Sequence, residues 1–295
     1  MRELEVPVGD LRFRVTIDGE LNADKSNAVF APHALTGNSR VAEWWPGIAG
    51  GDESFFSRNR YAIIGINALA PRRTTVRDIV QTHQRIFDAL EIERLAVVIG
   101  GSLGGMQALQ WALDAPQRVE RAIVVGAHDH HSAMGIALNA VQRDAIALDP
   151  VRGLALARKI AMLTYKSEEL FTQRYGRKPD RRDPARFDVE GYLDHQGDKL
   201  IARMDPAAYV ALTHAMDSFD VRDRTLPPGP DVTFVGISSD WLFRPQDVRA
   251  AAQRLGARYL ELHSDHGHDA FLAEPEKLRA LLAPLLTSAS EAARL

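Results

Sequence analysis

Hydrophobic and polar positions along the chain predict short strands that alternate with helices. Residues 11–17 alternate apolar and polar side chains, which predicts a half-buried strand at an edge of a sheet. Later apolar runs are short and continuous, as expected for strands that are covered on both faces. Helical periodicity at 79–90 and 105–113 separates them, so we expect an α/β fold with a mainly parallel sheet and helices on both faces. The continuous runs lie at residues 28–31, 61–66, 95–99, 122–126 and 232–237, and a last short strand is expected at 257–262.

The alternation of strands and helices stops after Gly126. From about residue 128 to residue 220 the pattern is helical, with a polar loop at 181–184 and no convincing strand. Strand character returns at residue 232. We therefore expect residues 1–127 and 221–295 to form the core domain, and residues 128–220 to form a helical lid inserted on top of the sheet.

Composition and charge exclude several classes of function. The 295 residues include 36 basic and 39 acidic side chains, and a net charge of −3 gives no strong field, so we expect no nucleic-acid and no membrane partner. The lack of cysteine excludes disulfides, thiolate metal sites and a cysteine nucleophile, and we expect neither a metal nor a bound cofactor. Since no secretory signal and no apolar run of roughly 20 residues is visible, we expect a cytoplasmic protein.

One stretch of the chain places a serine between a strand and a helix. Residues 95–99 run into Gly100-Gly-Ser-Leu-Gly104, and helical periodicity follows. Gly-x-Ser-x-Gly in this context is the nucleophile elbow of the α/β-hydrolase fold, where a strained turn lifts the serine hydroxyl above the sheet. The alternative is a plain glycine-rich turn or a phosphate loop, but a dinucleotide fingerprint would lie at the first strand. We predict that Ser102 is a nucleophile.

A serine nucleophile needs a histidine base, and the base needs a carboxylate to orient it. In this fold the order along the chain is serine, acid, histidine. Asp240 follows the strand predicted at 232–237, at the sheet edge where ligand sites lie, although alone it would read equally well as a turn cap. The glycine before His268 and the apolar helix start after it favour this histidine as the base. Three histidines compete for that role by position: His263, His266 and His268.

The oxyanion of an acyl-transfer intermediate needs two backbone donors. One should follow the nucleophile, and the other should come from the loop after an early strand. Here residues 28–31 lead into Pro32-His-Ala-Leu-Thr-Gly37. We predict that the N–H groups of Leu35 and Leu103 are these donors, although the first segment alone would also fit a plain polar turn.

With these residues assembled, the chain resembles the homoserine O-acetyltransferases of methionine biosynthesis. Two stretches are far more specific than Gly-x-Ser-x-Gly: Gly-Gly-Ser-Leu-Gly-Gly-Met-Gln from Gly100, and Gly-His-Asp-Ala-Phe-Leu from Gly267. The chain departs from the family in short segments between 67 and 75 and between 179 and 187, and in Met204, where the family usually has phenylalanine. Further matching stretches lie, in the family's order, at 33–37, 44–45, 153–158, 163–167, 192–197 and 239–243.

The resemblance implies roles for three further residues. Arg158 and Tyr165 match residues that line the active-site tunnel and bind the amino-acid substrate, and Asp269 would hold the α-amino group. An arginine suits an α-carboxylate because its guanidinium can bind both oxygens. The alternative is that Arg158 and Tyr165, seven residues apart on one helix face, simply pack the lid. The family's lid corresponds to residues 128–220, and its dimers form through that lid, so a homodimer is implied.

The reaction that the resemblance implies is ping-pong acyl transfer. An acyl group, acetyl in most of the family, passes from the co-substrate acyl-CoA to Ser102 and then to the hydroxyl of L-homoserine. Some relatives use succinyl-CoA, and some acylate L-serine. Two other hypotheses remain from the residues alone: an esterase or thioesterase that uses the same triad with water, and a binding protein with an idle pocket. A strained serine argues against the binding protein, which has no need of one.

Overall fold

Six parallel strands and a two-strand antiparallel extension form the sheet of this protein. The structure is a computed structural model that describes residues 1–68 and 74–286. The strand order is β1-β2-β4-β3-β5-β6-β7-β8, in which β3 to β8 run parallel while β2 is antiparallel to both of its neighbours. The expected α/β fold with a mainly parallel sheet is confirmed. The strands are β1 (Arg2–Val8), β2 (Leu11–Asp18), β3 (Ala28–Phe30), β4 (Ala62–Ile66), β5 (Leu95–Gly101), β6 (Val119–Val125), β7 (Asp231–Ile237) and β8 (Arg258–Leu262).

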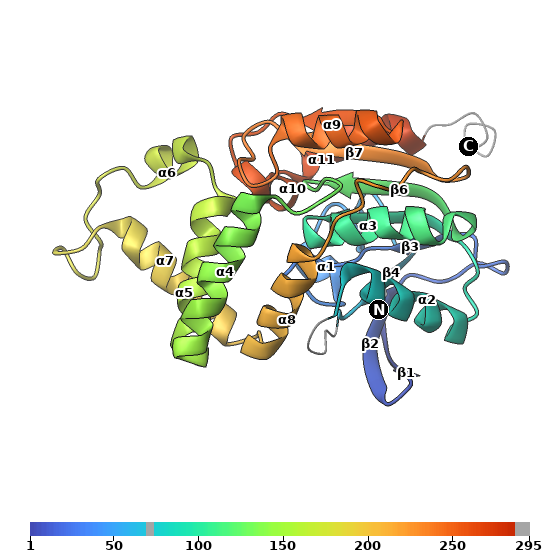
Figure 1. Cartoon of the computed structure of the whole chain (residues 1–295), viewed down its shortest axis with the longest axis horizontal. Helices are drawn as coiled ribbons and strands as arrows, with labels where there is room; N and C mark the ends of the chain where they lie inside the picture. The colour runs from blue at the N-terminus through green and yellow to red at the C-terminus, as the bar shows by residue number, and fades with distance from the viewer. Residues whose placement is uncertain (69–73, 287–295) are drawn as a thin grey trace.

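Helices cover both faces of the sheet, as the continuous apolar runs predict (Figure 1). One core cluster packs the sheet against α2, α3 and α9, and a second packs the opposite face against α1, α10 and α11. The core helices are α1 (Val41–Trp44), α2 (Val76–Ala89), α3 (Leu103–Asp114), α9 (Pro245–Leu255), α10 (Ala270–Ala273) and α11 (Pro275–Leu286). No helix of the described residues is long and apolar enough to cross a membrane.

The two edges of the sheet are β1 and β8, so the expectation that residues 11–17 form an edge strand is wrong. β2 lies second and pairs with both β1 and β4. In β1 Leu4, Val6 and Val8 alternate with exposed residues, but only Val6 is fully buried. An outer strand buries little side-chain area and tolerates Pro7 because its N–H side need not pair, so such a short alternation is a weak signal for a strand.

Five helices form a block beside the sheet, here called the helical block (Figure 1). The chain enters it after β6 and returns from it before β7. The two crossing segments pair with each other through their backbones. The N–H of His131 donates to the carbonyl of Phe219, and the N–H of Val221 donates to the carbonyl of Asp129. Residues 128–220, all of which are described, hold isolated bridges but no strand, as the sequence predicts. The block comprises α4 (Ala133–Leu148), α5 (Pro150–Tyr165), α6 (Glu168–Arg174), α7 (Asp188–Ile201) and α8 (Pro206–Asp217).

The two shortened segments differ in how much of them the structure describes. Residues 69–73, within the segment between 67 and 75, lie outside the described residues. The segment between 179 and 187 is a tight loop closed by a bridge between Pro179 and Phe187. This loop lies between α6 and α7, within the helical block.

Candidate active site

Ser102 occupies the turn between β5 and α3 in a strained backbone conformation. Its φ of 57° and ψ of −124° fall where residues other than glycine rarely lie. The serine N–H donates to the carbonyl of Val125 at 2.9 Å, and its own carbonyl accepts from Met106 at 3.0 Å. The turn is thus held by β6 on one side and by the first turn of α3 on the other, with Ser102 6% exposed.

The glycines around the serine are required by backbone contacts. A Cβ on Gly100 would lie 2.3 Å from the carbonyl of Gly104, across the turn. A Cβ on Gly104 would lie 2.2 Å from the carbonyl oxygen of Pro32. Since real contacts are never so short, any side chain at these positions would force the turn, or the loop after β3, to move.

The loop after β3 brings the second predicted oxyanion donor beside the first. The Gln107 side-chain amide donates to the carbonyls of His33 and Leu103, at 3.3 and 3.2 Å, and so ties the loop to the start of α3. Leu35 is buried in that loop and Leu103 is the first residue of α3. Within the described residues, neither backbone N–H donates to another protein group, as the predicted role of the two donors requires.

His33 fixes the shape of this loop from inside. Its Nδ1 donates to the carbonyl of Ala34 at 2.7 Å, and its Nε2 accepts from the N–H of Ala68 at 2.9 Å. Burial lowers the pKa of His33, against a smaller raising effect of the bond to Ala34, and a neutral ring suits both bonds. The loop is therefore clamped to the segment after β4, directly before residues 69–73.

Asp240 and His268 form a buried pair. His268 Nδ1 lies 2.6 Å from Asp240 Oδ2, and both side chains are almost fully buried. Asp240 Oδ1 accepts from the N–H groups of Leu242 and Phe243, each at 2.9 Å. The carboxylate is therefore fixed by backbone donors on one oxygen and orients the imidazole with the other, which is what an acid in a serine triad must do.

The environment of His268 suits a base. Burial acts to lower its pKa, but the charge and hydrogen bond of Asp240, with the charge of Asp269, outweigh burial and raise the pKa above its ordinary value. Its Nε2 is buried without a partner among the described residues. The ring stacks on Phe243 at 5.2 Å and would touch a Cβ on Gly126 at 3.3 Å. Gly126 directly follows Val125, which holds the N–H of Ser102, so the imidazole lies against the end of the strand that supports the elbow.

The other two candidate bases lie away from Asp240. His263 is 82% exposed in its side chain and faces Glu261 at 3.9 Å. His266 precedes the bend at Gly267, where φ is +66° and a Cβ would lie 2.8 Å from the backbone of Lys166. This bend turns the chain so that His268, of the three histidines, pairs with Asp240.

Arg158, Tyr165 and Asp269 gather near the imidazole. The ring of Tyr165 lies 5.5 Å from that of His268, and the Arg158 guanidinium lies 5.7 Å from the Tyr165 ring. Burial raises the pKa of Tyr165 to about 12, with Arg158 lowering it and Asp269 raising it. Among the described residues Arg158 has no carboxylate partner, whereas Asp269 pairs with Lys166 at 2.8 Å. An arginine without a carboxylate partner and a paired aspartate therefore both interact with Tyr165.

Three further residues near this site are not predicted by any single sequence motif. Lys166 pairs with Asp269, and Gln107 ties the two donor segments together. Tyr192 of α7 has its pKa raised to about 12 by burial, by Tyr175 and by Asp269, with Arg158 opposing. The signal that could have found them is their place in stretches shared with the family, at 163–167, 192–197 and beside Ser102.

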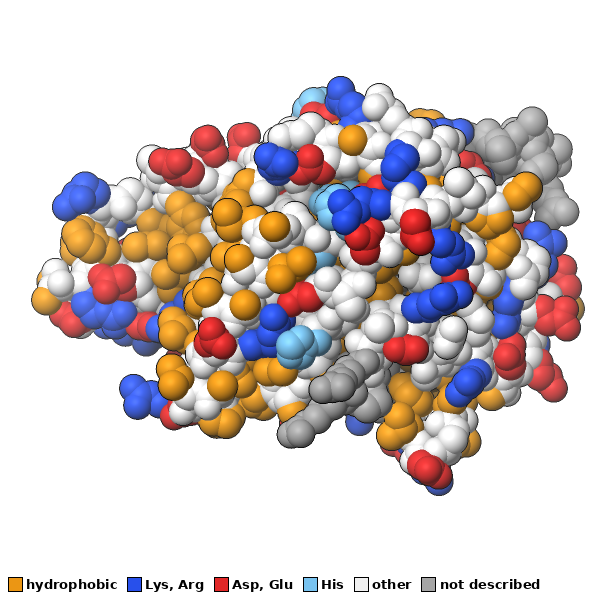
Figure 2. Space-filling model, viewed as in Figure 1, with side chains coloured by type: hydrophobic (Ala, Val, Ile, Leu, Met, Phe, Trp, Pro, Cys, Tyr) orange, Lys and Arg blue, Asp and Glu red, His pale blue; other side chains and the backbone are white. Residues whose placement is uncertain are grey.

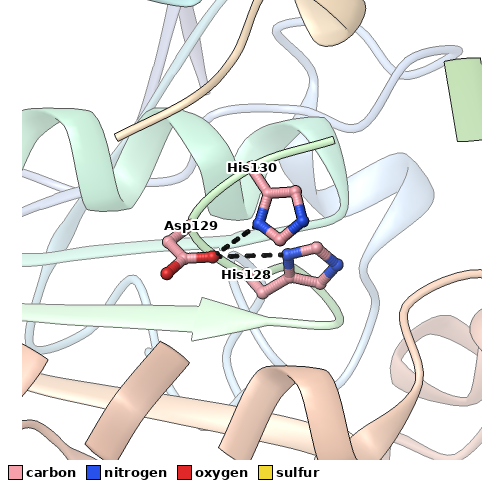
Figure 3. Close-up of side chains that lie close together, drawn as sticks. All are labelled: His128, Asp129 and His130. Atoms are coloured by element: carbon pink, nitrogen blue, oxygen red, sulfur yellow. Dashed lines mark hydrogen bonds and ion pairs between the residues drawn. The ribbon is translucent and has the colours of Figure 1, made fainter. Parts of the chain in front are cut away.

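Three residues after β6 form a cluster of side chains of the types that bind metal ions in proteins. The ligand atoms of His128, Asp129 and His130 lie within 4.8 Å of one another, and both rings face one carboxylate oxygen (Figure 3). That oxygen is 2.8 Å from His130 Nδ1 and 3.7 Å from His128 Nδ1, while the other oxygen accepts from Arg254 at 2.8 Å. Because the guanidinium already offsets the only negative charge, a buried divalent ion would lack compensation. We assign the cluster to anchoring the crossing into the helical block.

Comparisons with known proteins point to one family. The profile of the alpha/beta hydrolase fold matches residues 27–275. The chain is 36% identical to a homoserine O-acetyltransferase of Acidiphilium cryptum, over 94% of the chain and 90% of that protein. It is 38% identical to one of Deinococcus radiodurans, over 90% and 84% respectively.

Two solved structures are also similar. A homoserine O-acetyltransferase from Staphylococcus aureus has a TM-score of 0.82 and 27% identity, covering 98% of this chain and 95% of that one. Esterase E22 has the same TM-score of 0.82 at 20% identity, covering 95% and 99%, a likeness that shows the fold alone. The sequence matches extend over nearly the full length of both partners, beyond what a shared fold requires. The chain belongs to the homoserine O-acetyltransferase family of alpha/beta hydrolase-fold proteins.

Proposed function

We propose that this protein transfers an acetyl group from acetyl-CoA to the γ-hydroxyl of L-homoserine, with Ser102, Asp240 and His268 as the catalytic triad. The observation that carries the proposal is the buried Asp240–His268 pair, which packs against Gly126 next to the residue that holds the strained Ser102. The charges of Arg158 and Asp269 both act on Tyr165, whose ring lies 5.5 Å from that of His268. Family membership favours this acyl donor and this acceptor. Transfer to homoserine would supply methionine biosynthesis, in the cytoplasm.

The first half-reaction loads the serine. His268 Nε2 takes the hydroxyl proton while Ser102 Oγ attacks the thioester carbonyl carbon. The N–H groups of Leu35 and Leu103 stabilise the oxyanion of the tetrahedral intermediate. The C–S bond then breaks, CoA leaves with the proton that His268 had taken, and the acetyl group stays on Ser102.

The second half-reaction passes the acetyl group to the acceptor. His268 takes the proton of the homoserine γ-hydroxyl, whose oxygen attacks the acetyl carbonyl, and the two donors again hold the oxyanion. The bond to Ser102 Oγ breaks, and the serine recovers a proton from His268. The negative charge of Asp240 stabilises the imidazolium that forms in both halves.

The acceptor is an amino acid with one positive and one negative end. We infer that Arg158 binds its α-carboxylate and that Asp269 binds its α-ammonium. Tyr165 interacts with both charges, and with a pKa raised to about 12 by burial its hydroxyl is protonated at neutral pH. Two fixed charges of opposite sign orient homoserine so that its γ-hydroxyl, and not a charged group, reaches the acyl-serine.

The helical block would act as a lid and as a dimer interface. The ring of Tyr165 on α5 lies 5.5 Å from that of His268, which supports a lid that would exclude the water that otherwise hydrolyses an acyl-enzyme. Hydrophobic side chains gather on the outside of the block (Figure 2), and Leu148 is 90% exposed. Light scattering of the wild type and of Leu148→Asp tests the dimer. Exposed apolar residues of α4 and α5 are Met134, Ile136, Val141, Leu148, Val151, Leu156 and Leu163.

One substrate matrix tests the activity. Purified protein is incubated with acetyl-CoA or succinyl-CoA, and with L-homoserine, L-serine or no acceptor, while CoA release and acylated product are measured. We expect the highest kcat/KM for acetyl-CoA with homoserine and slow CoA release without acceptor after one turnover. A higher kcat/KM with succinyl-CoA or with serine would show that the acyl donor or the acceptor differs from the proposed one. Continuous release at the same rate without acceptor would mark a thioesterase and reject the proposal.

A further inference from the structure

The corner between α5 and α6 lies directly on the loop that carries His268. Ser167 Oγ donates to the carbonyl of Asp265. A Cβ on Gly267 would lie 2.8 Å from the backbone of residues 165–167. The backbone of Lys166 is therefore held against this loop, and its side chain has a short reach to the residue that follows the imidazole.

Lys166 already satisfies the anion of the proposed acceptor site. Its ammonium lies 2.8 Å from Asp269 Oδ2, and the two side chains are only 15% and 17% exposed. The cation at the other end of the site, Arg158, has no such partner among the described residues. One end of the site is thus open for a substrate carboxylate, while the other end is occupied by an ammonium of the protein itself.

We propose that Lys166 is the resident counter-ion of the acceptor's ammonium site and competes with the substrate's amino group for Asp269. This inference rests on the proposed function and deepens it. During the first half-reaction no acceptor is present. Lys166 then neutralises Asp269, which would otherwise be a buried, unpaired carboxylate beside the imidazole. When homoserine enters, its ammonium takes over Asp269, so its apparent affinity is reduced by the free energy of displacing Lys166.

The competition predicts opposite effects on two acceptors. Replacing Lys166 by methionine keeps the aliphatic stem but removes the competing charge. Homoserine should then bind roughly three- to tenfold more tightly, the range expected for one ion pair of intermediate burial. Homoserine without its amino group, 4-hydroxybutanoate, should bind more weakly, because Asp269 is left unneutralised and repels its carboxylate.

The chain offers a control lysine on α5, the helix that ends directly before Lys166. Lys159 of α5 pairs with Asp194 of α7, so Lys159→Met also removes a lysine from an ion pair, but one that does not involve Asp269. Lys159→Met should leave the affinities for both acceptors unchanged. Lys166→Arg, which keeps a cation beside Asp269, should restore the wild-type ratio of the two affinities.

Calorimetric titration in a Ser102→Ala background measures these affinities without chemistry, and the KM for homoserine with Ser102 intact repeats the comparison. A higher ratio of homoserine to 4-hydroxybutanoate affinity in Lys166→Met alone supports the competition. An unchanged ratio, or weaker binding of both acceptors, overturns it. A wild-type protein that releases no CoA from acetyl-CoA refutes the proposed function instead, whatever the affinities are.

Discussion

Replacing Asp240 by asparagine separates two roles of this carboxylate. Oδ1 accepts two backbone hydrogen bonds, from Leu242 and Phe243, and Oδ2 accepts from His268. The amide oxygen of asparagine can keep both backbone bonds. Its NH₂ group, however, would face His268 Nδ1 as a donor, and the ring would respond by placing its proton on Nε2. A ring protonated on Nε2 cannot take the proton of Ser102.

The two roles predict effects of different kinds, one on kcat and one on the free energy of unfolding. Loss of the correct tautomer should lower kcat by about 10⁴-fold, or roughly 5.5 kcal/mol. Asp240→Asn should change the free energy of unfolding little, because the backbone donors stay satisfied. Asp240→Ala should lose the same activity and also leave two buried N–H groups unpaired, which costs about 1–3 kcal/mol for each group.

The assay combines turnover and stability of the same two variants. CoA release gives kcat and kcat/KM, and urea unfolding gives the free energy of unfolding. An asparagine variant within tenfold of wild-type activity would refute the role of Asp240 as the orienting acid. Equal destabilisation by asparagine and alanine would refute the assignment of Oδ1 to the backbone donors.

Three further predictions concern the elbow and the base. Ser102→Gly should abolish transfer and raise the free energy of unfolding by about 1 kcal/mol, because the strain at φ 57° is relieved; a less stable variant would contradict this. Gly104→Ala should lower kcat about 100-fold by pushing Pro32 and the oxyanion loop, while Gly256→Ala, at a positive φ in open space, should change only stability. Since the pKa of His268 is raised from 6.5, kcat/KM for acetyl-CoA should rise with pH with a midpoint above 6.5. The contribution of protonated His268 to the free energy of unfolding is complete below pH 6.5 and is lost as the pH rises through the raised pKa. A midpoint at or below pH 6.5 in the activity profile or in the stability profile would contradict the corresponding prediction.

The elbow is predictable from sequence because most of its constraints are local. Gly100 is required by a contact with Gly104 inside the turn itself, and the flanking strand and helix have clear periodicities, whereas Gly104 is required by Pro32 of a distant loop. The fold class follows from the same alternation and is confirmed. The edge strand β1 is harder to predict, because its alternation covers only Leu4, Val6 and Val8, and only Val6 is fully buried.

Contacts between segments that are distant in sequence cannot be predicted from any local sequence pattern. Three histidines follow β8, and only the bend at Gly267 decides that His268 pairs with Asp240. The pair of Lys166 with Asp269 depends on how the α5–α6 corner packs on that loop. Such pairings depend on tertiary packing, so sequence indicates the residue types that are available but not which of them meet.

The covalent intermediate on Ser102 is the central claim. Protein mixed with acetyl-CoA, without acceptor, is quenched in acid and digested, and the peptides are examined by mass spectrometry. We predict one acetyl group per chain on the peptide that contains Ser102, with one equivalent of CoA released, and its removal as O-acetylhomoserine when homoserine is added. CoA release only in the presence of homoserine, with Ser102 never acetylated, would show direct transfer and contradict the account.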